Sequence, residues 1–417
     1  MKTTLPANFI PKKPFPGFKW KWASLQCTES LNDPVVLLGV LFRMRKLEQS
    51  GTFKYSSEEF ASELRGLSND IKDSIGVDLA RRTGERNLIR NSGQYWRAVG
   101  LLADDNKGVI ELSDFGRKVA DREISQTEFA AVTIQTFQLP NRQTQSDEET
   151  ALWESHGLVL HPFRILLQTL RTLRQMFGEN EGFVTPFELA KIIIPLSGNK
   201  AEAADYANFI HRHRQGGLDL SKWPDCTPGA NDFRIAREYL LFLSNYGYVN
   251  RLEEGKGRED EIYIYNAVLD SEIETLLSVP AREASVNIIR DTSVASDIER
   301  RRIGTARQGQ ARFRRDILNE FGRCVITNVT MPEVLETAHI KPFRYNGENT
   351  VANGFAMRLD IHLLFDAGHL RISEIGEVRL STRARLDYGA LIPPRIVLPD
   401  CTNREFLRWR WDNFDGL

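Results

Sequence analysis

Two of the seven histidines in the chain stand at a spacing that could support acid–base and metal chemistry. His339 is followed fourteen residues later by Asn353, and His362 comes nine residues after that. A neutral imidazole can accept a proton near pH 7, and an imidazole nitrogen is also a frequent ligand of divalent cations. Hydrolysis of a phosphodiester uses both abilities, because water must be deprotonated and charge on the phosphate must be neutralised. The pattern therefore points to a metal-dependent phosphodiesterase site.

The segments that carry these residues predict two strands and a helix. A strand is expected in "VLETAHI", which contains His339 and is ended by Pro342, and a second strand in "FAMR", just after Asn353. The stretch "LDIHLLFDAG" predicts a short helix that carries His362 and stops at Gly368, a residue suited to a helix C-terminus. Three adjacent elements would allow the three side chains to converge on one point.

Three stretches of the C-terminal region resemble the HNH endonuclease family. They are "GQARFRRDILNEFGRCVITN", "LETAHIKPF" and "NGFAMRLDIHLLFDAGHLRIS", which together span residues 309–373. The resemblance is to the subgroup that has an alanine–histidine pair and an "IHxLFDxG" helix. It implies a ββα-metal fold, endonuclease activity and a requirement for Mg²⁺ or Mn²⁺.

The resemblance also implies a role for each residue of the pattern. His339 corresponds to the general base, and His362 corresponds to a metal ligand on the helix. Asn353 is expected to hydrogen-bond across the loop and to fix the orientation of the strand that carries His339, while Gly354 permits a tight turn. His339 and Asn353 are therefore the predicted catalytic residues.

The second metal ligand is less fully specified by the sequence. Asp366 lies four residues after His362, on the same helical face, so the two could share one cation, although Asp366 could equally brace the helix. Relatives often have an aspartate ligand directly before the base histidine, but Ala338 stands there and cannot bind a metal. The predicted ligands are His362 and Asp366, with Glu336 as the alternative carboxylate and with water and phosphate completing the shell, which suits Mg²⁺. His369, just past the helix, is expected to be incidental.

No structural zinc is expected. Cys324 stands where some relatives have the first cysteine of a zinc site, but Thr327 occupies the position of its partner and no later cysteine pair follows. The four cysteines lie far apart, and we expect them to be reduced, buried thiols. They are Cys27, Cys226, Cys324 and Cys401.

The N-terminal two thirds of the chain predicts mostly helices, with two outlines of a winged helix. Helices are expected between Asp33 and Gly51 and after Ser57. We expect helix, turn, short strand and helix in "YWRAVGLLADDNKGVIELSDFGRKVAD", and a helix before a hairpin in "FRIAREYLLFLSNYGYVNRLEEGKGREDEIYIYN". For the second outline, structural or protein-contact roles compete with DNA binding. The region resembles the winged-helix recognition regions of some modular restriction endonucleases.

These expectations combine into a multidomain α+β chain. The predicted divisions are two winged-helix-like domains at 1–150 and 151–280, a linker at 281–303 and an HNH endonuclease domain at 304–417.

Basic residues gather in two places, although the formal net charge of the chain is −1. Residues 301–344 hold nine basic and four acidic residues, a local excess of 9 − 4 = +5, and residues 81–97 hold five arginines and one glutamate. Such patches suit contacts with phosphates, although a solvated helix face has the same composition. The predicted DNA contacts are Arg81, Arg82, Arg86, Arg312, Arg314, Arg315 and Lys341.

The remaining composition is that of an ordinary globular protein, with 41% hydrophobic and 27% charged residues. No apolar run is long enough for a membrane helix, and lysine and proline stand where a signal peptide would be apolar. We therefore expect a cytoplasmic protein whose partner is double-stranded DNA and not a membrane. Because one site attacks one phosphate, cleavage of both strands predicts a homodimer.

Three functions remain open at this point. The leading one is a DNA endonuclease of the restriction or anti-phage defence type, with N-terminal recognition and C-terminal cleavage. The second is a non-catalytic DNA-binding regulator with a degenerate HNH unit, which Ala338 favours and the retained His339 and His362 oppose. The third is a structure-specific or RNA-directed nuclease, which the sequence does not exclude.

Overall fold

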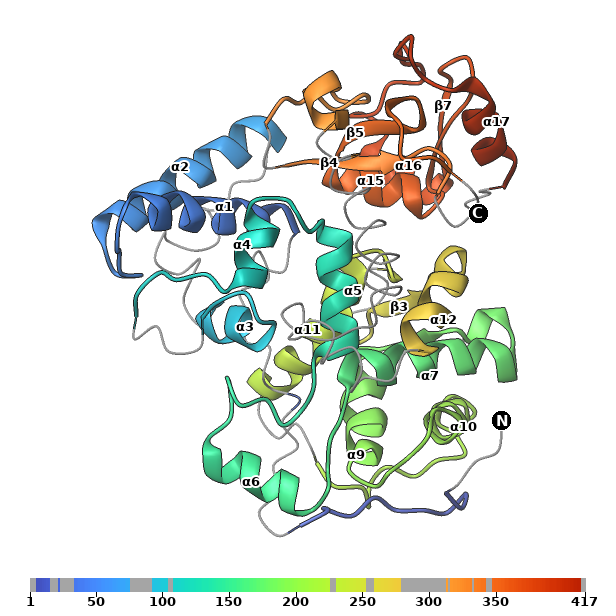
Figure 1. Ribbon diagram of the computed structural model, residues 1–417. Helices are drawn as coiled ribbons and strands as arrows, with labels where there is room; N and C mark the ends of the chain where they lie inside the picture. The colour runs from blue at the N-terminus through green and yellow to red at the C-terminus, as the bar shows by residue number, and fades with distance from the viewer. Residues whose placement is uncertain are drawn as a thin grey trace, which may run out of the picture.

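The computed structural model describes residues 5–15, 22, 34–75, 92–103, 108–225, 230–252, 259–278, 313, 316–331, 334–342 and 347–413. The described residues up to 278 form a helical region, and those from 313 onward form a C-terminal region with two small antiparallel sheets (Figure 1). This mixture of helices and small sheets confirms the predicted α+β class. The predicted linker at 281–303 lies outside the described residues.

The helical region begins with six helices that surround part of a common core. They are α1 (Pro34–Ser50), α2 (Glu58–Ile75), α3 (Ser92–Ala98), α4 (Asp114–Ala120), α5 (Gln126–Thr136) and α6 (Asp147–Ser155). Pro34 occupies the first position of α1, where its missing N–H costs nothing. The hydroxyl of Ser57 accepts a hydrogen bond from the amide of Phe60 at 3.3 Å and so caps α2. Both helices start where the sequence predicts them.

The short strand expected in "VIEL" is not formed. Val109 and Leu112 make only isolated bridges, to Lys54 and Leu102 respectively. The next residue, Ser113, already caps α4 by accepting a hydrogen bond from Gly116 at 2.9 Å. The chain therefore turns into a helix before a ladder can extend.

The second half of the helical region combines helices with a three-stranded sheet. Its elements are α7 (Pro162–Phe177), η3 (Glu179–Glu181), β1 (Phe183–Val184), α8 (Pro186–Glu188), the π-helix η4 (Leu189–Ile193), α9 (Ile194–Ser197), α10 (Ala203–Arg214), α11 (Ala230–Asn245), β2 (Val249–Leu252), β3 (Ile262–Tyr265), η5 (Ala267–Leu269) and α12 (Asp270–Ser278). β3 pairs antiparallel with β1 on one side and β2 on the other. The expected helix and hairpin are present as α11, β2 and β3. Every residue of α11 from 235 to 243 is buried, so α11 is a core helix.

One hydrophobic core runs through both halves of the helical region, from Phe15 to Leu276. Aromatic rings from the two halves meet within it, where the ring of Phe129 on α5 lies 6.4 Å from that of Phe242 on α11 and 5.9 Å from that of Tyr246, the residue after α11. Buried side chains are thus shared across residue 150. The division into domains at 1–150 and 151–280 stays a prediction.

The C-terminal region contains the predicted pair of strands and the helix that follows them. Its elements are β4 (Leu335–His339), η8 (Val351–Asn353), β5 (Gly354–Arg358), α15 (Leu359–Asp366), β6 (Leu370–Ile372), β7 (Val378–Leu380), α16 (Thr382–Tyr388) and α17 (Arg404–Asn413). β4 and β5 pair antiparallel, with His339 opposite Gly354. A second hydrophobic core, from Cys324 to Leu407, lies beneath this hairpin and α15.

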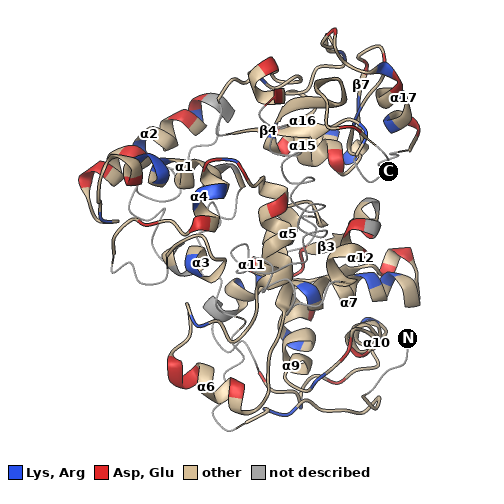
Figure 2. Ribbon diagram, viewed as in Figure 1, with Lys and Arg blue, Asp and Glu red and all other residues tan. Residues whose placement is uncertain are grey.

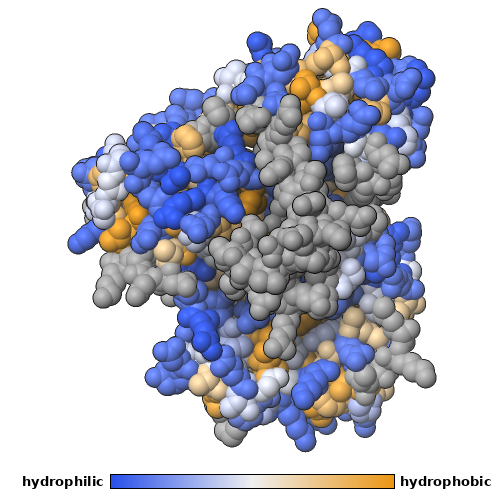
Figure 3. Space-filling model, viewed as in Figure 1, coloured by the Kyte–Doolittle hydropathy of each residue, from blue (hydrophilic) through white to orange (hydrophobic). Residues whose placement is uncertain are grey.

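The two regions meet where α5 approaches β4 and α15 (Figure 1). The face in Figure 3 is mainly hydrophilic over α1 and α2, and its hydrophobic residues form small separate patches. Within the part of the chain that the structure describes, no helix combines the length and the apolar character needed to cross a membrane.

Candidate active site

His339 ends β4, where its half-buried imidazole is held from two sides. Its ring stacks on that of Phe313, with centroids 4.1 Å apart and planes inclined by 18°. Its Nε2 lies 2.9 Å from Oδ1 of Asn349. Because an amide oxygen can only accept a hydrogen bond, this contact places the proton of a neutral ring on Nε2. In this tautomer Nδ1 carries no hydrogen.

Asn353 is fully buried beside the loop that joins β4 to β5. Its Oδ1 accepts a hydrogen bond from the amide of Lys341 at 2.8 Å. Its Nδ2 donates to the carbonyl oxygens of Lys341 at 2.9 Å and Glu348 at 2.8 Å. These three bonds cross the loop as the sequence led us to expect, and they fix the backbone two residues beyond His339. A part for Asn353 in catalysis stays a prediction.

Gly354 is needed for a different reason from the one expected. Its φ of −147° is extended backbone, which any residue adopts, so it permits no tight turn. A Cβ at this position would lie 2.5 Å from Cδ1 of Ile317 and 2.6 Å from Cζ of Phe313. Glycine therefore allows Phe313 to pack closely on the strand, beside the ring of His339.

His362 lies on α15 between two carboxylates, with its side chain only 9% exposed. Its Nδ1 is 3.2 Å from Oε2 of Glu336, and its Nε2 is 2.9 Å from Oδ2 of Asp366. Burial acts to lower the pKa of His362, but Asp366 and Glu336 stabilise the charged ring more strongly and raise the pKa to about 10. Burial likewise acts to raise the pKa of Asp366, but His362 and Arg410 hold it well below its ordinary value. The two carboxylates therefore favour the protonated, charged form of His362.

His362 and Asp366 are the two predicted cation ligands, and their side chains are in contact, whereas Glu336 contacts the other nitrogen of the ring. Among the described residues, no group of three or more His, Cys, Asp or Glu side chains is placed to hold a metal ion. At His362 the reason is that Glu336 and Asp366 contact opposite nitrogens of the ring. The separation of 2.9 Å between Nε2 and Oδ2 is close to the roughly 3 Å between adjacent ligands of an octahedral ion with bonds of about 2.1 Å. Two protein ligands completed by water and phosphate suit Mg²⁺.

Arg410, on α17, joins the end of β4 to the end of α15. This residue is 2% exposed, and its guanidinium donates to the carbonyl oxygens of His339 at 3.2 Å, Ile340 at 3.1 Å and Phe365 at 2.6 Å. It also donates to Oδ1 of Asp366 at 3.0 Å and lies over the ring of Phe365. One side chain therefore sets the spacing between the predicted base and the predicted metal ligands.

Lys341 is the one predicted DNA contact within the described residues. The others, Arg81, Arg82, Arg86, Arg312, Arg314 and Arg315, lie outside them. The ammonium of Lys341 lies 5.7 Å from the ring centroid of Phe406 and 5.1 Å from that of Trp409. Elsewhere, basic and acidic residues are interspersed over α1 and α2, where Arg43 pairs with Glu63 at 3.1 Å (Figure 2). The described surface of these helices is therefore not a continuous positive face.

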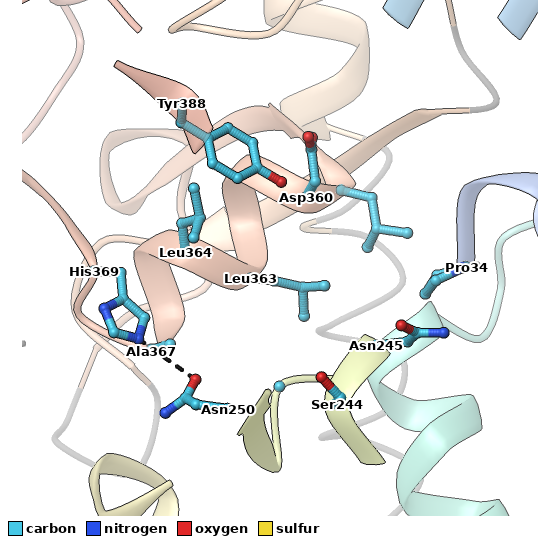
Figure 4. A pocket seen from close by; sticks show the side chains of 12 residues that line it. Pro34, Ser244, Asn245, Asn250, Asp360, Leu363, Leu364, Ala367, His369 and Tyr388 are labelled. Atoms are coloured by element: carbon cyan, nitrogen blue, oxygen red, sulfur yellow. Dashed lines mark hydrogen bonds between the residues drawn. The ribbon is translucent and has the colours of Figure 1, made fainter. Parts of the chain in front are cut away.

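A pocket of about 270 Å³ lies on another face of α15, where the two regions meet (Figure 4). Leu363 and Leu364 of α15 line it, together with residues from α11, β2 and α16. His369, which we expected to be incidental, connects the regions here. Its Nδ1 lies 2.9 Å from the hydroxyl of Ser381, and its Nε2 lies 3.4 Å from Oδ1 of Asn250. None of the predicted catalytic or metal residues lines this pocket.

Cys324 is buried in the core of the C-terminal region, and its sulfur accepts a hydrogen bond from the amide of Thr327 at 3.5 Å. Cys401 is exposed, contrary to our expectation, because it lies in the turn before α17 beside the exposed Asp400. Cys27 and Cys226 lie outside the described residues.

Sequence reasoning missed three residues that shape this site, Phe313, Asn349 and Arg410. Asn349 lies in a stretch that predicts only a turn, and Phe313 lies among arginines that suggest a charged surface. The sequence does carry one signal for Arg410, which lies between two tryptophans. An arginine in that position suits partial burial with its guanidinium stacked on a ring. That signal does not say which carbonyl groups or which carboxylate the arginine contacts.

Residues 324–373 match the family model of the HNH endonucleases. The matched segment contains His339, Asn353, His362 and Asp366, which confirms the resemblance predicted for the C-terminal region and indicates nuclease activity. No curated protein matches the chain. The likeness of the helical region to winged-helix recognition regions stays a prediction.

Proposed function

We propose that the chain is a DNA endonuclease that depends on a divalent cation and cuts with its C-terminal region. The observation that carries this proposal is the connection, through Arg410, of a histidine oriented as a base to a His362–Asp366 pair that fits a cation. The match of residues 324–373 to HNH endonucleases supports the same reaction class.

In this proposal each side chain has one task. His339 takes the proton of the attacking water at Nδ1, since Asn349 accepts the hydrogen on Nε2. Asn353 keeps His339 in place by holding the backbone of Lys341. When a cation is bound by His362 and Asp366, it supplies charge neutralisation at the phosphate and at the leaving oxygen.

We propose that the helical region recognises DNA. Its two winged-helix-like units do not support this role equally. α11 and the hairpin β2–β3 have the expected order of helix and wing, but α11 is buried from 235 to 243 and cannot enter a DNA groove. We therefore propose a packing role for the second unit. The first unit contains the basic cluster at 81–97, for which we propose contacts with DNA phosphates.

We also propose that two copies of the chain cut the two strands of DNA, in a restriction or anti-phage role in the cytoplasm. The basis is that the site offers one base and one pair of cation ligands, which suits one in-line attack on one phosphate. A twofold dimer presents the same site to each antiparallel strand.

The alternative function is a DNA-binding regulator whose HNH unit is inactive. Ala338 favours it, because the aspartate that relatives often have at this position would add a metal ligand. A nuclease that is structure-specific or RNA-directed is a further alternative, and the same assay separates it from the leading proposal.

The test is a cleavage assay on supercoiled plasmid, methylated and unmethylated, and on branched DNA and RNA, with Mg²⁺, Mn²⁺ or EDTA. We expect nicked and then linear DNA in the presence of either cation and none with EDTA. DNA binding without cleavage at any cation concentration would favour the regulator. Cleavage only of branched DNA or of RNA would favour the third function. Solution mass measured over the same protein concentrations tests the dimer, and linear product from a strict monomer without a nicked intermediate would contradict it.

A further inference from the structure

The carboxylate of Glu336 is shared between the two regions of the molecule. Its Oε2 faces Nδ1 of His362 at 3.2 Å, within the C-terminal region. Its Oε1 accepts a hydrogen bond at 2.8 Å from the backbone amide of Gln126, in the helical region. Glu336 is 6% exposed and Gln126 is 1% exposed, so water does not replace these contacts. A buried carboxylate that contacts a predicted metal ligand is therefore held by the other region.

The amide of Gln126 is a donor because it belongs to the first residue of α5. The first amides of a helix have no partner within the helix, and the amide of Glu128 is already bonded to the capping hydroxyl of Ser125 at 3.1 Å. The amide of Gln126 instead points to Glu336 across the boundary between the regions. Figure 1 shows α5 running from beneath β4 and α15 into the helical region.

The position of α5 is fixed in turn by the core of the helical region. The side-chain oxygen of Gln126 accepts a hydrogen bond from the hydroxyl of Tyr246, the residue after α11, at 3.1 Å. One turn further along α5, the ring of Phe129 packs against Tyr246 and Phe242. A continuous path of buried contacts thus leads from α11 through α5 and Glu336 to His362.

We infer that α5 is part of the cleavage site: its first amide orients Glu336, which orients His362 as a cation ligand, so the helical region sets the cation affinity of the nuclease. This inference rests on the proposed function, since it takes His362 as a ligand. A carboxylate that accepts the Nδ1 hydrogen of a histidine leaves Nε2 to bind the cation, and loss of such a carboxylate typically lowers metal affinity. Glu336 is therefore a positioning residue. Any movement of α5 that accompanies DNA recognition acts directly on the geometry of His362.

A proline at position 126 replaces the amide hydrogen by the ring Cδ, so the bond to Oε1 of Glu336 is lost and the carboxylate is displaced, while the backbone of α5 accepts the change. Gln126 is the first residue of α5, the helical position at which proline is best tolerated. Ser125 has φ −71° and ψ 164°, which is the extended backbone that a following proline requires. Gln126→Ala is the matched control, because it removes the same side chain, with its bond to Tyr246, and keeps the amide.

The readout is Mn²⁺ binding to the full chain, followed by electron paramagnetic resonance, with the thermal midpoint measured in parallel. We expect Gln126→Pro to bind Mn²⁺ about ten times more weakly than Gln126→Ala, at the lower end of the effect of losing an orienting partner. Gln126→Ala should stay closer to the unaltered chain than Gln126→Pro does, because it keeps the amide that contacts Glu336. In the plasmid assay, raising the Mn²⁺ concentration should restore cleavage by Gln126→Pro.

Equal Mn²⁺ affinity of the two variants, in a chain that binds Mn²⁺ and cuts DNA, would overturn the inference and leave the proposed function standing. If the unaltered chain neither binds Mn²⁺ nor cuts, the proposed function fails and the inference fails with it. Should Gln126→Pro not fold, Glu336→Gln decides the question. A glutamine cannot accept hydrogens from both the Gln126 amide and His362 Nδ1, so weaker Mn²⁺ binding supports the inference and unchanged binding overturns it.

Discussion

Two clusters of buried charge among the described residues, one in each region, differ in the kind of cation that they contain. In the helical region, Glu261 is surrounded by permanent donors. Arg237 donates to its two oxygens at 2.7 and 2.6 Å, and Arg251 and the hydroxyl of Tyr263 add bonds of 3.0 and 2.7 Å. Burial acts to raise the pKa of Glu261, but these donors outweigh burial and lower it. A guanidinium keeps its charge in proteins, so this cluster does not exchange its cation.

In the C-terminal region, the buried cation is the imidazolium of His362, which can lose its proton. Glu336 and Asp366 contact its two nitrogens, and Arg410 holds the second oxygen of Asp366. The side chain of Asp366 is 41% exposed, whereas that of Glu261 is 9% exposed. Water and ions can therefore reach the carboxylate of Asp366, which faces Nε2 of His362.

The comparison shows that buried charge alone does not mark a functional site. The cluster in the helical region is closed and permanent, which suits a structural role. The cluster in the C-terminal region is partly exposed at Asp366, and under the proposed function its histidine releases a proton when a cation binds. Four sets of substitutions test this distinction.

The largest effect is expected for His339→Ala. Loss of a general base lowers the rate of cleavage by about 10²–10⁴-fold, while DNA binding and folding are retained because His339 is only half-buried. Single-turnover cleavage, a filter-binding assay and the thermal midpoint measure the three properties. His156→Ala, at an exposed histidine of the helical region, is the control and should cut normally. Normal cleavage by His339→Ala, or its unfolding, would remove His339 from the role of base.

Arg237→Met should destabilise the protein without altering the C-terminal cluster. It leaves the carboxylate of Glu261 buried without its main partner, which typically costs about 3–5 kcal/mol of unfolding free energy. Urea denaturation measures this loss. Arg142→Met, at an exposed pair with Glu154, should leave stability unchanged. A large loss of Mn²⁺ affinity in folded Arg237→Met would show that the two clusters are not independent.

Asp366→Asn should weaken cation binding about tenfold, less than His362→Ala, because the amide oxygen remains a weak ligand. The concentration of Mg²⁺ that gives half-maximal cleavage measures this effect, and excess cation should restore activity. Asp360→Asn is the control on the same helix, since Asp360 is occupied by Arg358 at 2.6 Å. The same Mg²⁺ requirement in both variants would exclude Asp366 as a ligand.

The smallest effect is expected from reversing the charges of Arg81, Arg82 and Arg86. Each lost phosphate contact lowers the slope of log affinity against log salt by about one, and affinity falls similarly for all DNA sequences. The measurement is duplex binding by the full chain in EDTA at several salt concentrations. An unchanged slope would place DNA recognition elsewhere.

Local patterns were sufficient to predict the elements that carry the site. β4, β5 and α15 form where alternation, a turn and a helical stop indicate them, and the bonds of Asn353 span only 5 to 12 residues. The start of α1 and the cap of α2 follow from Pro34 and Ser57 for the same reason. These features depend on neighbours in the chain, which the sequence displays directly.

Contacts between distant segments could not be predicted in this way. Arg410 reaches Ile340 across 70 residues, and Gln126 reaches Glu336 across 210 residues. Which carboxylate faces which nitrogen of His362 depends on those contacts, so the sequence left Glu336 and Asp366 as alternatives. The strand predicted in "VIEL" was wrong, because the alternation in that stretch does not show that the next residue, Ser113, caps a helix. Val109 and Leu112 therefore form only isolated bridges.

A Mn²⁺ titration of the full chain by electron paramagnetic resonance, compared with His362→Ala and Arg237→Met, decides whether the cluster at His362 binds a cation. We predict one Mn²⁺ site in the unaltered chain that is lost in His362→Ala and kept in folded Arg237→Met. Equal Mn²⁺ binding by the unaltered chain and His362→Ala would contradict the claim that the cluster at His362 is an exchangeable cation site.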